Sequence, residues 1–254
     1  MSLMDVCGLR KSYNHREVVK GVDFNVQKGE IVGLLGQNGA GKTTAFRMTI
    51  GMIPRDAGQI FFQGEDVSGL PMYQRARRGM GYLSQEPSIF TRMSVADNVM
   101  SILETLRLPR AERRKRLDEL LARLGLTHLR KSLAYTLSGG ERRRLEITRA
   151  LVTNPRLMLL DEPFSGVDPK AVNEIQEIIL QLRDSGMGIL LTDHNVYDTL
   201  SVTDRSYIIS QGRIEASGTP EELLSNAKAR ELYFGDKLKI DHIVRSRGEK
   251  GTAG

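Results

Sequence analysis

Residues 31 to 43, IVGLLGQNGAGKT, dictate the architecture of this chain more strongly than any other stretch. The apolar run IVGLL predicts a strand buried on both faces, and the stretch from Lys42 to Ile50 has the pattern of a helix. The glycine-rich turn between them fits the pattern G-x-x-x-x-G-K-[ST], whose glycines let backbone N–H groups curl around a phosphate. A buried strand, a phosphate-binding turn and a helix in this order predict an α/β fold.

This turn and the start of the following helix predict a nucleotide site. The N-terminus of a helix carries a positive dipole that favours a bound anion. We expect Lys42 to neutralise charge on the β- and γ-phosphates of ATP, and the hydroxyl of Thr43 to hold Mg²⁺. A plain glycine turn that joins strand to helix is the alternative interpretation. The expected ATP-binding residues of this segment are Gly36, Gln37, Asn38, Gly39, Ala40, Gly41, Lys42, Thr43 and Thr44.

The stretch LMLLDEP, residues 157 to 163, predicts the acidic part of the same site. Its apolar strand ends in two carboxylates, at the edge of the sheet where α/β folds bind ligands. We expect Asp161 to hold Mg²⁺, directly or through water. Glu162, one residue further on, points in a different direction from Asp161 and is the candidate base that orients and polarises an attacking water. Two exposed acids that end a strand are the alternative interpretation.

Three further side chains are candidates for this site. His194 ends the run GILLTDH and could donate to the γ-phosphate or hold the attacking water, and a structural histidine is a fair alternative. Gln85 ends the strand-like run MGYLSQ, and its amide could reach both Mg²⁺ and water. Tyr13, upstream of the turn, could stack on adenine, and an ordinary edge-strand tyrosine is nearly as good an interpretation.

Strand-like and helix-like stretches alternate along most of the chain, which predicts a mostly parallel sheet surrounded by helices. The residues from Ser94 to Val152 differ because their periodicity is helical throughout. We interpret this block as an inserted subdomain. The expected strands are 4–8, 18–26, 31–36, 60–62, 80–85, 157–160, 188–192, 206–210 and 213–217, and the expected helices outside the block are 42–50, 171–182, 196–200 and 220–224.

Composition excludes several classes of protein. At 254 residues the chain can bury a full core, and it has no apolar run near the ~20 residues that a membrane span needs. The start lacks the basic flank and apolar run of a signal peptide, so we expect a location on the cytoplasmic side. The net charge of +6 suits an anionic ligand, yet aromatic residues are only 6% with no tryptophan, so we expect no nucleic-acid partner. Basic runs such as 142–144 are typical of solvated helix faces.

The stretch LSGGERRR, residues 137 to 144, predicts a second anion site. A serine and two glycines precede an arginine-rich helical pattern, and such a start leaves helix N–H groups free to hold an anion. A simple capped helix is the alternative interpretation. The chain therefore contains two segments suited to phosphate, far apart in sequence.

Together these motifs resemble those of the ATP-binding cassette (ABC) ATPases. The resemblance spans about residues 3 to 235, and the whole set is highly specific. The matching motifs, in family order, are the aromatic Tyr13, Walker A (36–44), Gln85, the LSGGE segment (137–141), Walker B (157–162), the SGVD loop (165–168) and His194.

This resemblance implies a domain organisation and a dimer. It implies an ABC ATPase domain at 1–235, made of a RecA-like core (1–90 and 153–235), with an antiparallel β subdomain, and a helical subdomain (about 91–152), followed by a partly disordered tail (236–254). Two chains would pair head to tail, so that the LSGGE segment of one closes over the ATP held by the other. The residues implied at the partner's ATP are Ser138, Gly139, Gly140, Glu141 and Asp168.

Longer stretches resemble the ATPases of lipopolysaccharide exporters, among them LSGGERRRLEITRAL and LTDHNVYDTL. This resemblance implies separate permease subunits in the inner membrane, with the chain on their cytoplasmic face. Their helices would dock in a groove near Gln85, where an exposed Ile-Phe pair suits a partner, and burial of that pair between subdomains is the alternative. The expected lining residues are Tyr82, Ile89, Phe90 and Met93.

Two other functions share much of this motif set. One is the ATPase of an importer, such as the branched-chain amino-acid type, and the other is a soluble ABC ATPase of the iron–sulfur assembly type. The chain also departs from the family pattern at Gln37, where proline is common, and in the length of the tail after Asp236. A loop defined by its backbone should tolerate the glutamine.

Overall fold

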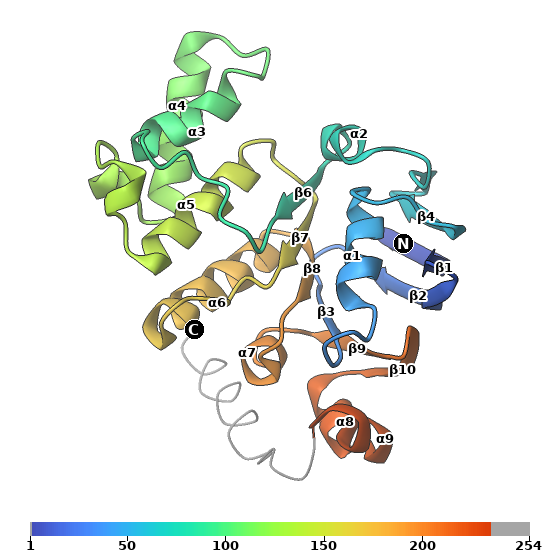
Figure 1. The fold of residues 1–254 in the computed structure, drawn as a ribbon. Coiled ribbons are helices and arrows are strands. Elements are labelled where there is room, and N and C mark those ends of the chain that lie inside the picture. The colour runs from blue at the N-terminus through green and yellow to red at the C-terminus, as the bar shows by residue number, and fades with distance from the viewer. Residues whose placement is uncertain (1, 235–254) are drawn as a thin grey trace.

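The computed structural model describes residues 2–234, which form two β-sheets with helices on their faces (Figure 1). The expectation of a partly disordered tail at 236–254 lies outside the described residues. The predicted fold class is confirmed, because a mostly parallel sheet, an antiparallel β part and an inserted group of helices are all present. The two sheets position the candidate site.

A six-stranded sheet forms the centre of the fold. Its strand order is β10-β9-β3-β8-β7-β6, and all its pairs are parallel except β9–β10. The strands β3, β7 and β8 are buried along their whole length, as their continuous apolar runs predict. The strands of this sheet are β3 (Ile31–Leu35), β6 (Met80–Leu83), β7 (Leu157–Asp161), β8 (Gly188–Thr192), β9 (Arg205–Ser210) and β10 (Arg213–Gly218).

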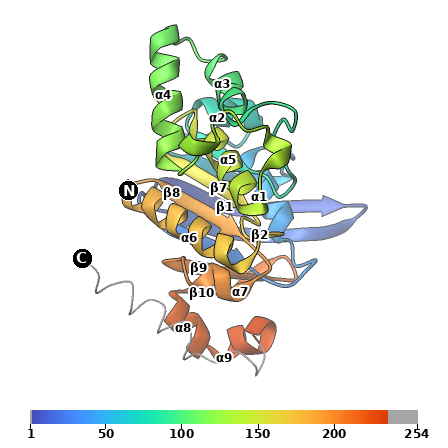
Figure 2. The same ribbon diagram turned by 90° about the vertical axis from the view of Figure 1, so that its left-hand side faces the viewer.

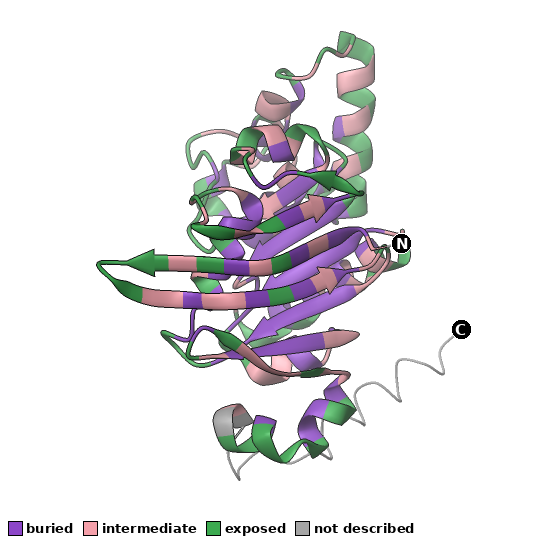
Figure 3. Ribbon diagram, turned by 90° about the vertical axis from the view of Figure 1, so that its right-hand side faces the viewer, coloured by how far each residue is buried: buried purple, intermediate pink, exposed green. Residues whose placement is uncertain are grey.

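A smaller antiparallel sheet of order β2-β1-β4-β5 packs beside it. Its hairpin of β1 and β2 projects well beyond the body of the protein (Figure 3). The two residues at the hairpin tip, Asn14 and His15, have φ angles of 47° and 63°, the conformation that a two-residue hairpin turn requires. The strands of this sheet are β1 (Met4–Tyr13), β2 (Arg16–Val26), β4 (Ala57–Phe62) and β5 (Glu65–Asp66).

The central sheet is covered on both faces, and its side chains alternate between two apolar layers. Leu157 and Leu159 of β7 pack in one cluster with Phe46 of α1 and with the antiparallel sheet. Met158 and Leu160, the alternate positions, pack in a second cluster with α6 and the inserted helices. The helix α1 therefore lies between the two sheets. This packing fixes the position of its first residue, Lys42, which follows the glycine-rich turn of residues 36–41, called the phosphate loop below.

The three longest helices of the block from 94 to 152 are inserted between β6 and β7, which are neighbours in the sheet. Figures 1 and 2 show α3, α4 and α5 grouped beyond one edge of the sheet. Within residues 2–234, no helix combines the length and the apolar character needed to cross a bilayer. The helices are α1 (Lys42–Ile50), α2 (Met72–Arg77), α3 (Val95–Leu103), α4 (Arg110–Arg123), α5 (Gly139–Leu151), α6 (Pro169–Asp184), α7 (Val196–Leu200), α8 (Pro220–Ser225) and α9 (Ala227–Ala229), with short 3-10 turns at Thr127–Leu129 and Ala134–Thr136 and a π-helical turn at Arg230–Phe234.

Candidate active site

Four neighbouring parallel strands bring the predicted catalytic residues to one edge of the sheet. Gly36 directly follows β3, and Glu162 directly follows β7. Gln85 lies two residues after β6, and His194 lies two residues after β8. Because the carboxyl ends of parallel strands share an edge, the loops that carry these residues meet there. Residues up to 158 positions apart in the sequence thus form one site.

The loop after β3 requires glycine at two positions. A Cβ atom on Gly36 would lie 2.1 Å from the carbonyl oxygen of Ile209, and one on Gly41 would lie 2.8 Å from the carbonyl oxygen of Val18. Gly41 is also the N-cap of α1, with a φ of 104°, and no side chain caps this helix. A helix start without a side-chain cap keeps its first N–H groups available for a ligand, as an anion site requires.

Lys42 places its ammonium inside this loop. The side chain is buried, and Nζ donates to the carbonyl oxygens of Gly36 at 2.5 Å and Gln37 at 2.9 Å. Burial lowers the pKa of Lys42, and the nearby charge of Glu162 acts in the opposite direction. Thr43, the next residue, is exposed, and Thr44 is half-buried. The amine therefore lies between the loop backbone and the acidic end of β7.

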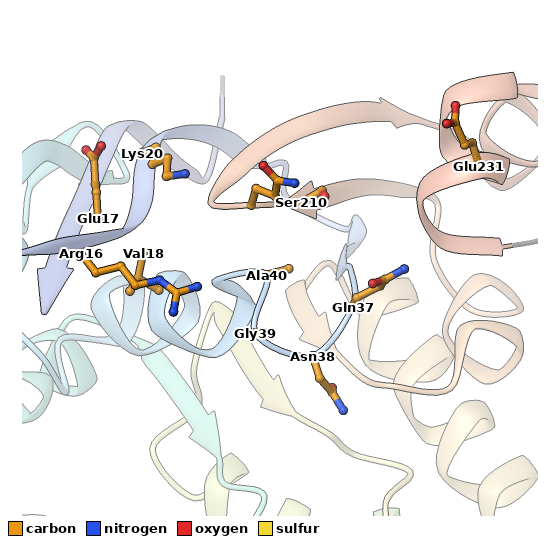
Figure 4. A pocket seen from close by; sticks show the side chains of 11 residues that line it. Arg16, Glu17, Val18, Lys20, Gln37, Asn38, Gly39, Ala40, Ser210 and Glu231 are labelled. Carbon is orange, nitrogen blue, oxygen red and sulfur yellow. The ribbon is translucent and has the colours of Figure 1, made fainter.

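A pocket of about 790 Å³ opens beside the loop (Figure 4). Tyr13 does not line it; this residue is 46% exposed and lies under the Lys11 ammonium, 5.5 Å from the ring centre. Stacking of Tyr13 on adenine stays a prediction. Sequence reasoning missed the β2 and C-terminal walls, because nothing in their local pattern points to a loop so distant in sequence. The lining residues are Arg16, Glu17, Val18, Lys20, Gln37, Asn38, Gly39, Ala40, Ser210, Gln211 and Glu231.

Glu162 contacts both of the other predicted catalytic side chains. Gln85 Nε2 donates to Glu162 Oε2 at 2.9 Å, and His194 Nδ1 lies 3.4 Å from the same oxygen. His194 Nδ1 also lies 3.3 Å from Oδ1 of Asp193. Glu162 has a φ of 47°, a left-handed conformation that is uncommon for a residue other than glycine. Strained backbone of this kind clusters at active sites, so the conformation itself suggests a functional position.

Asp161, the last residue of β7, is a buried carboxylate. Only 2% of it is exposed, and Tyr82 donates its hydroxyl hydrogen bond to Asp161 Oδ2 at 3.3 Å. Burial raises the pKa of Asp161, and the charge of Arg47 opposes that rise. Burial together with Asp161 raises the pKa of Tyr82 to about 12, so the phenol remains a donor at neutral pH. A cation at Asp161 would compensate the buried negative charge.

An arginine of α5 holds the loops that carry these acids. Arg143 donates to the carbonyl oxygens of Ser84 at 2.9 Å, Glu162 at 3.0 Å and Pro163 at 3.0 Å. It also pairs with the buried Glu146 at 2.8 Å. The expectation that the basic run 142–144 forms a solvated helix face is wrong for Arg143, which is buried. The guanidinium replaces water as the partner of these carbonyl groups and ties α5 to the end of β7.

A model of the family described as "ABC transporter" matches residues 19–165, more than half of the chain. The chain belongs to the ABC transporter family. Its curated relatives include the lipopolysaccharide export system ATP-binding protein LptB of Escherichia coli K12, which is 52% identical over 94% of this chain and 100% of the relative. The protein of the same name from Acidithiobacillus ferridurans is 51% identical over 94% of this chain and 99% of the relative.

Solved ABC transporter structures have the same fold. An ATP-binding cassette in its ADP conformation superposes with a TM-score of 0.83 at 26% identity, covering 93% of this chain and 100% of that one. The cbiO1 protein of Clostridium perfringens, part of the ABC transporter complex cbiONQ, has a TM-score of 0.82 at 28% identity and covers 96% of this chain and 99% of that one. The chain is thus an ABC-type ATP-binding subunit, and its enzyme class is an ATPase.

The LSGGE segment forms the start of α5 and makes a capping box. Ser138 Oγ accepts from the Glu141 amide at 3.3 Å, and Glu141 Oε2 accepts from the Ser138 amide at 2.8 Å. Ser138 and Gly139 are exposed, whereas Gly140 is buried. Asp168 caps α6 by accepting from two backbone amides at 3.1 Å each. These residues have structural roles as helix caps, and their predicted contact with a partner's ATP stays a prediction.

The segment after Gln85 only partly matches the expected groove. Phe90 is 50% exposed, but Ile89 is buried in the large cluster, so the expectation of an exposed Ile-Phe pair is wrong for Ile89. Ile89 is buried because it packs with the inserted helices, the alternative that the sequence left open. Tyr82 contacts Asp161, and Met93 is half-buried. Of the four expected residues, Phe90 is the one that presents a large apolar surface.

Proposed function

We propose that this chain is the ATP-hydrolysing subunit of a transporter that extracts lipopolysaccharide from the inner membrane for export. The observation that supports this most is the identity of 50–52% to lipopolysaccharide export ATP-binding proteins, over nearly their whole length. The convergence of Lys42, Glu162, Gln85 and His194 at one sheet edge supports the hydrolytic part. We assign the ABC unit to 1–235, with its core at 1–90 and 153–235 and its helical subdomain at about 91–152.

ATP would bind through the phosphate loop. The backbone N–H groups of the loop, the start of α1 and the Lys42 ammonium supply the donors and the positive charge that phosphates require. The proposed nucleotide contacts are the loop residues 36–44, with Tyr13 as the adenine contact.

The donor set proposed for Mg²⁺ fits that ion chemically. Thr43, Asp161 and Gln85 would offer a hydroxyl, a carboxylate and an amide oxygen, the hard donors that Mg²⁺ prefers. Residues 2–234 contain no cluster of three or more His, Cys, Asp or Glu side chains suited to a metal. Mg²⁺ is usually held by one or two carboxylates and by phosphates of the substrate, a part that Asp161 would supply. When bound, it would neutralise phosphate charge.

Hydrolysis would depend on Glu162. Its carboxylate would orient a water molecule and accept a proton from it. Gln85 is neutral and donates to this carboxylate at 2.9 Å, so it orients the base without cancelling its charge. His194, which follows the strand on the other side of β7, would donate to the γ-phosphate or hold the water. Positioning and charge neutralisation would account for most of the rate enhancement.

Two copies of the chain would form the working unit. Each has one phosphate loop and one LSGGE segment, so a two-fold dimer would use both. The exposure of Ser138 and Gly139 leaves them accessible to a second copy. The residues proposed to face the partner's ATP are Ser138, Gly139, Gly140, Glu141 and Asp168. ATP would then hold the dimer closed, and hydrolysis would release it.

Permease subunits would dock on the surface around Phe90, which would place the chain on the cytoplasmic face of the inner membrane. The Phe90 ring is exposed, yet its backbone is held by Asn98, which accepts from the Phe90 amide at 2.8 Å and donates to its carbonyl oxygen at 3.0 Å. The Arg149 guanidinium lies 4.8 Å from the ring centre. A fixed, exposed aromatic side chain is typical of an interface anchor. In this proposal the docking surface around Phe90 is bordered by Met93 and Tyr82, and the buried Ile89 packs beneath it.

The variant Glu162→Gln tests the hydrolytic part. We expect kcat to fall by about 100-fold or more while ATP binding persists and a dimer accumulates. ATPase assays, nucleotide binding and sedimentation would measure these three quantities. Glu119→Gln, on the exposed face of α4, is the matched control and should behave as wild type. Hydrolysis by Glu162→Gln near the wild-type rate would remove Glu162 from its proposed role.

Co-purification tests the transport part. A tagged chain recovered from detergent-solubilised membranes should bring down lipopolysaccharide-exporting permease subunits, and Phe90→Ala should weaken that recovery without changing the unfolding temperature. Recovery of an importer's permease, or a chain that stays in the soluble fraction whether or not a permease is present, would contradict the proposed export function.

A further inference from the structure

The dipeptide Gln-Gly forms a hairpin turn at two places in the chain. Gln63 and Gly64 join β4 to β5, and Gln211 and Gly212 join β9 to β10. The φ angles are 54° and 80° at the first turn and 48° and 82° at the second. Both turns thus have the left-handed conformation at both central residues that a two-residue hairpin requires. Because local sequence and local structure are the same, any difference between the turns comes from their surroundings.

The two glycines of these turns have very different neighbours. Gly64 is exposed, and a Cβ atom placed on it would have no atom within 4 Å. Gly212 is buried, and a Cβ atom there would lie 2.5 Å from the carbonyl oxygen of Val18 in β2. A contact this short is a clash with backbone, so alanine at position 212 would push β2 and the turn apart. The close packing around Gly212 is therefore not a requirement of the turn itself.

Both backbone polar groups of Gly212 bond to other elements. Its amide donates to the carbonyl oxygen of Ala40, in the phosphate loop, at 2.9 Å. Its carbonyl oxygen accepts from the amide of Lys20, in β2, at 2.8 Å. These groups are buried and would cost free energy if they were left unpaired. Gly212 therefore forms a bridge of two hydrogen bonds between the phosphate loop and β2.

Two further close approaches join the same three segments. A Cβ atom on Gly36, the first residue of the phosphate loop, would lie 2.1 Å from the carbonyl oxygen of Ile209 in β9. A Cβ atom on Gly41, the last residue of the loop, would lie 2.8 Å from the same Val18 carbonyl oxygen that faces Gly212. The loop, β2 and the β9–β10 hairpin thus pack backbone against backbone, and glycine permits each approach. A shift of the hairpin would therefore move the loop or β2.

The segments that Gly212 joins also line the candidate nucleotide pocket. Figure 4 shows Val18 and Lys20 of β2, Ala40 of the phosphate loop and Ser210 of β9 around this pocket. The bonds of Gly212 to Ala40 and Lys20 therefore connect two walls of the pocket. The separation of these walls depends on the turn.

We propose that Gly212 is a positioning residue for ATP binding, which holds the phosphate loop at a fixed separation from β2 and so sets the width of the nucleotide pocket. The inference rests on the proposed ATP site. The candidate residues for hydrolysis lie on other loops, after β6, β7 and β8. A displaced turn should therefore weaken nucleotide binding more than it slows the chemical step.

The test compares Gly212→Ala with the matched control Gly64→Ala in the full chain. Both substitutions place a Cβ atom on a left-handed residue of the same turn, but only Gly212→Ala meets the Val18 carbonyl oxygen. We expect Gly212→Ala to raise the KM for ATP and the Kd for ADP about 10-fold, with kcat at saturating ATP within about threefold of wild type. Gly64→Ala should leave all three within about twofold of wild type. Wild-type KM and Kd in Gly212→Ala, or an equal loss of binding in Gly64→Ala, would overturn the inference.

Amide hydrogen exchange in the wild-type chain gives a second measurement, which decides the matter even if Gly212→Ala does not fold. Saturating ADP should slow exchange of the Gly212 and Lys20 amides about threefold or more, because bound nucleotide would hold the loop and the loop is bonded to the turn. The Gly64 amide should exchange at the same rate with and without ADP. Exchange at Gly212 and Lys20 that ADP does not change would overturn the inference. A wild-type chain that does not bind ADP would instead contradict the proposed function, so the two failures are distinguishable.

Discussion

The helices α1 and α5 both begin at glycine-rich turns suited to phosphate, but their first turns differ in chemistry. The start of α1 has a left-handed glycine at its N-cap, no side-chain cap and no acidic residue in its first turn. The start of α5 has a complete capping box between Ser138 and Glu141. Lys42 occupies the first position of α1, whereas a carboxylate occupies the third position of α5.

This difference suggests an order of binding. The N–H groups and the ammonium at α1 have their strongest interactions with an anion, so this helix start can bind a phosphate by itself. At α5 the serine hydroxyl and the Glu141 carboxylate already complete the helix, and a carboxylate repels a phosphate. The start of α5 is therefore suited to a phosphate that another site already holds.

The largest effect is expected for Gly41→Ala at the start of α1. A residue with a Cβ atom is strained at φ 104°, and the new atom would lie 2.8 Å from the Val18 carbonyl oxygen. We expect ATP affinity to fall by about 100-fold or more and the free energy of unfolding to fall by about 1–3 kcal/mol. Gly64→Ala, with φ 80° and open space around it, is the control for backbone strain alone. Wild-type ATP affinity in Gly41→Ala would contradict the proposal that the start of α1 binds the phosphates.

A smaller effect on function, but a larger one on stability, is expected at the buried Arg143, which holds α5 to the acidic loops. Arg143→Met leaves Glu146 buried without its partner, so the free energy of unfolding should fall by about 3–5 kcal/mol. Removing both charges, as Arg143→Met with Glu146→Leu, should restore most of that stability. The ATPase rate should stay about 10-fold or more below wild type in both proteins, because the carbonyl groups near Glu162 lose their donor. A double variant with wild-type activity would limit Arg143 to a structural role.

A glycine-to-alanine substitution at the start of α5 should raise the stability of the protein, whereas Gly41→Ala at the start of α1 should lower it. Gly139 is helical, and a Cβ atom there would meet its nearest neighbour at 3.7 Å, an ordinary contact. We expect Gly139→Ala to raise the free energy of unfolding by up to about 1 kcal/mol. ATP binding by the single chain should not change, while hydrolysis in the dimer should fall several-fold. Chemical denaturation and ATPase assays would measure both effects, and a loss of ATP binding would contradict the contrast.

The smallest effect concerns the pH dependence of the α5 cap. Hydrogen bonds from the Ser138 backbone and side chain lower the pKa of Glu141 below its ordinary value of 4.5. The ionised cap therefore contributes stability above pH 4.5 and loses it as the pH falls through the lower folded-state pKa. Because Glu141 is only partly buried, we expect Glu141→Gln to cost about 0.5 kcal/mol at pH 7 and progressively less as the pH falls below 4.5. A cost that does not change between neutral and acidic pH would assign the cap to neutral hydrogen bonds.

Much of the fold could be predicted because its signals are local. The phosphate loop, β7 and α1 can each be predicted from a few consecutive residues. The helices α1 and α7 begin and end where the sequence predicts. The helix α2 was missed because its stretch MYQRAR has no apolar stripe. Its Arg75 is instead buried and donates to four backbone carbonyl groups, among them that of Met48 at the end of α1. Such a helix is stabilised by contacts that periodicity does not record.

Long-range contacts limited the prediction of the site. Arg143 was assigned to a solvated face because the backbone carbonyl groups that it contacts lie 18 to 59 positions away along the chain. The same reason hid Asp193, which joins the loops after β7 and β8. Ile89 illustrates a different limit, since an apolar pair after a strand gives no sign of which member points inward. The sequence thus predicted that Gln85, Glu162 and His194 lie together, but it did not predict the contacts that position their loops.

The unusual backbone of Glu162 has a consequence for the evolution of this protein. A left-handed conformation costs a residue with a Cβ atom on the order of 1 kcal/mol, a cost that glycine would avoid. Glycine at position 162 should raise the free energy of unfolding, but it would remove the Glu162 carboxylate. Selection for thermal stability alone would therefore favour replacement of Glu162, and it would remove the carboxylate that we propose as the catalytic base.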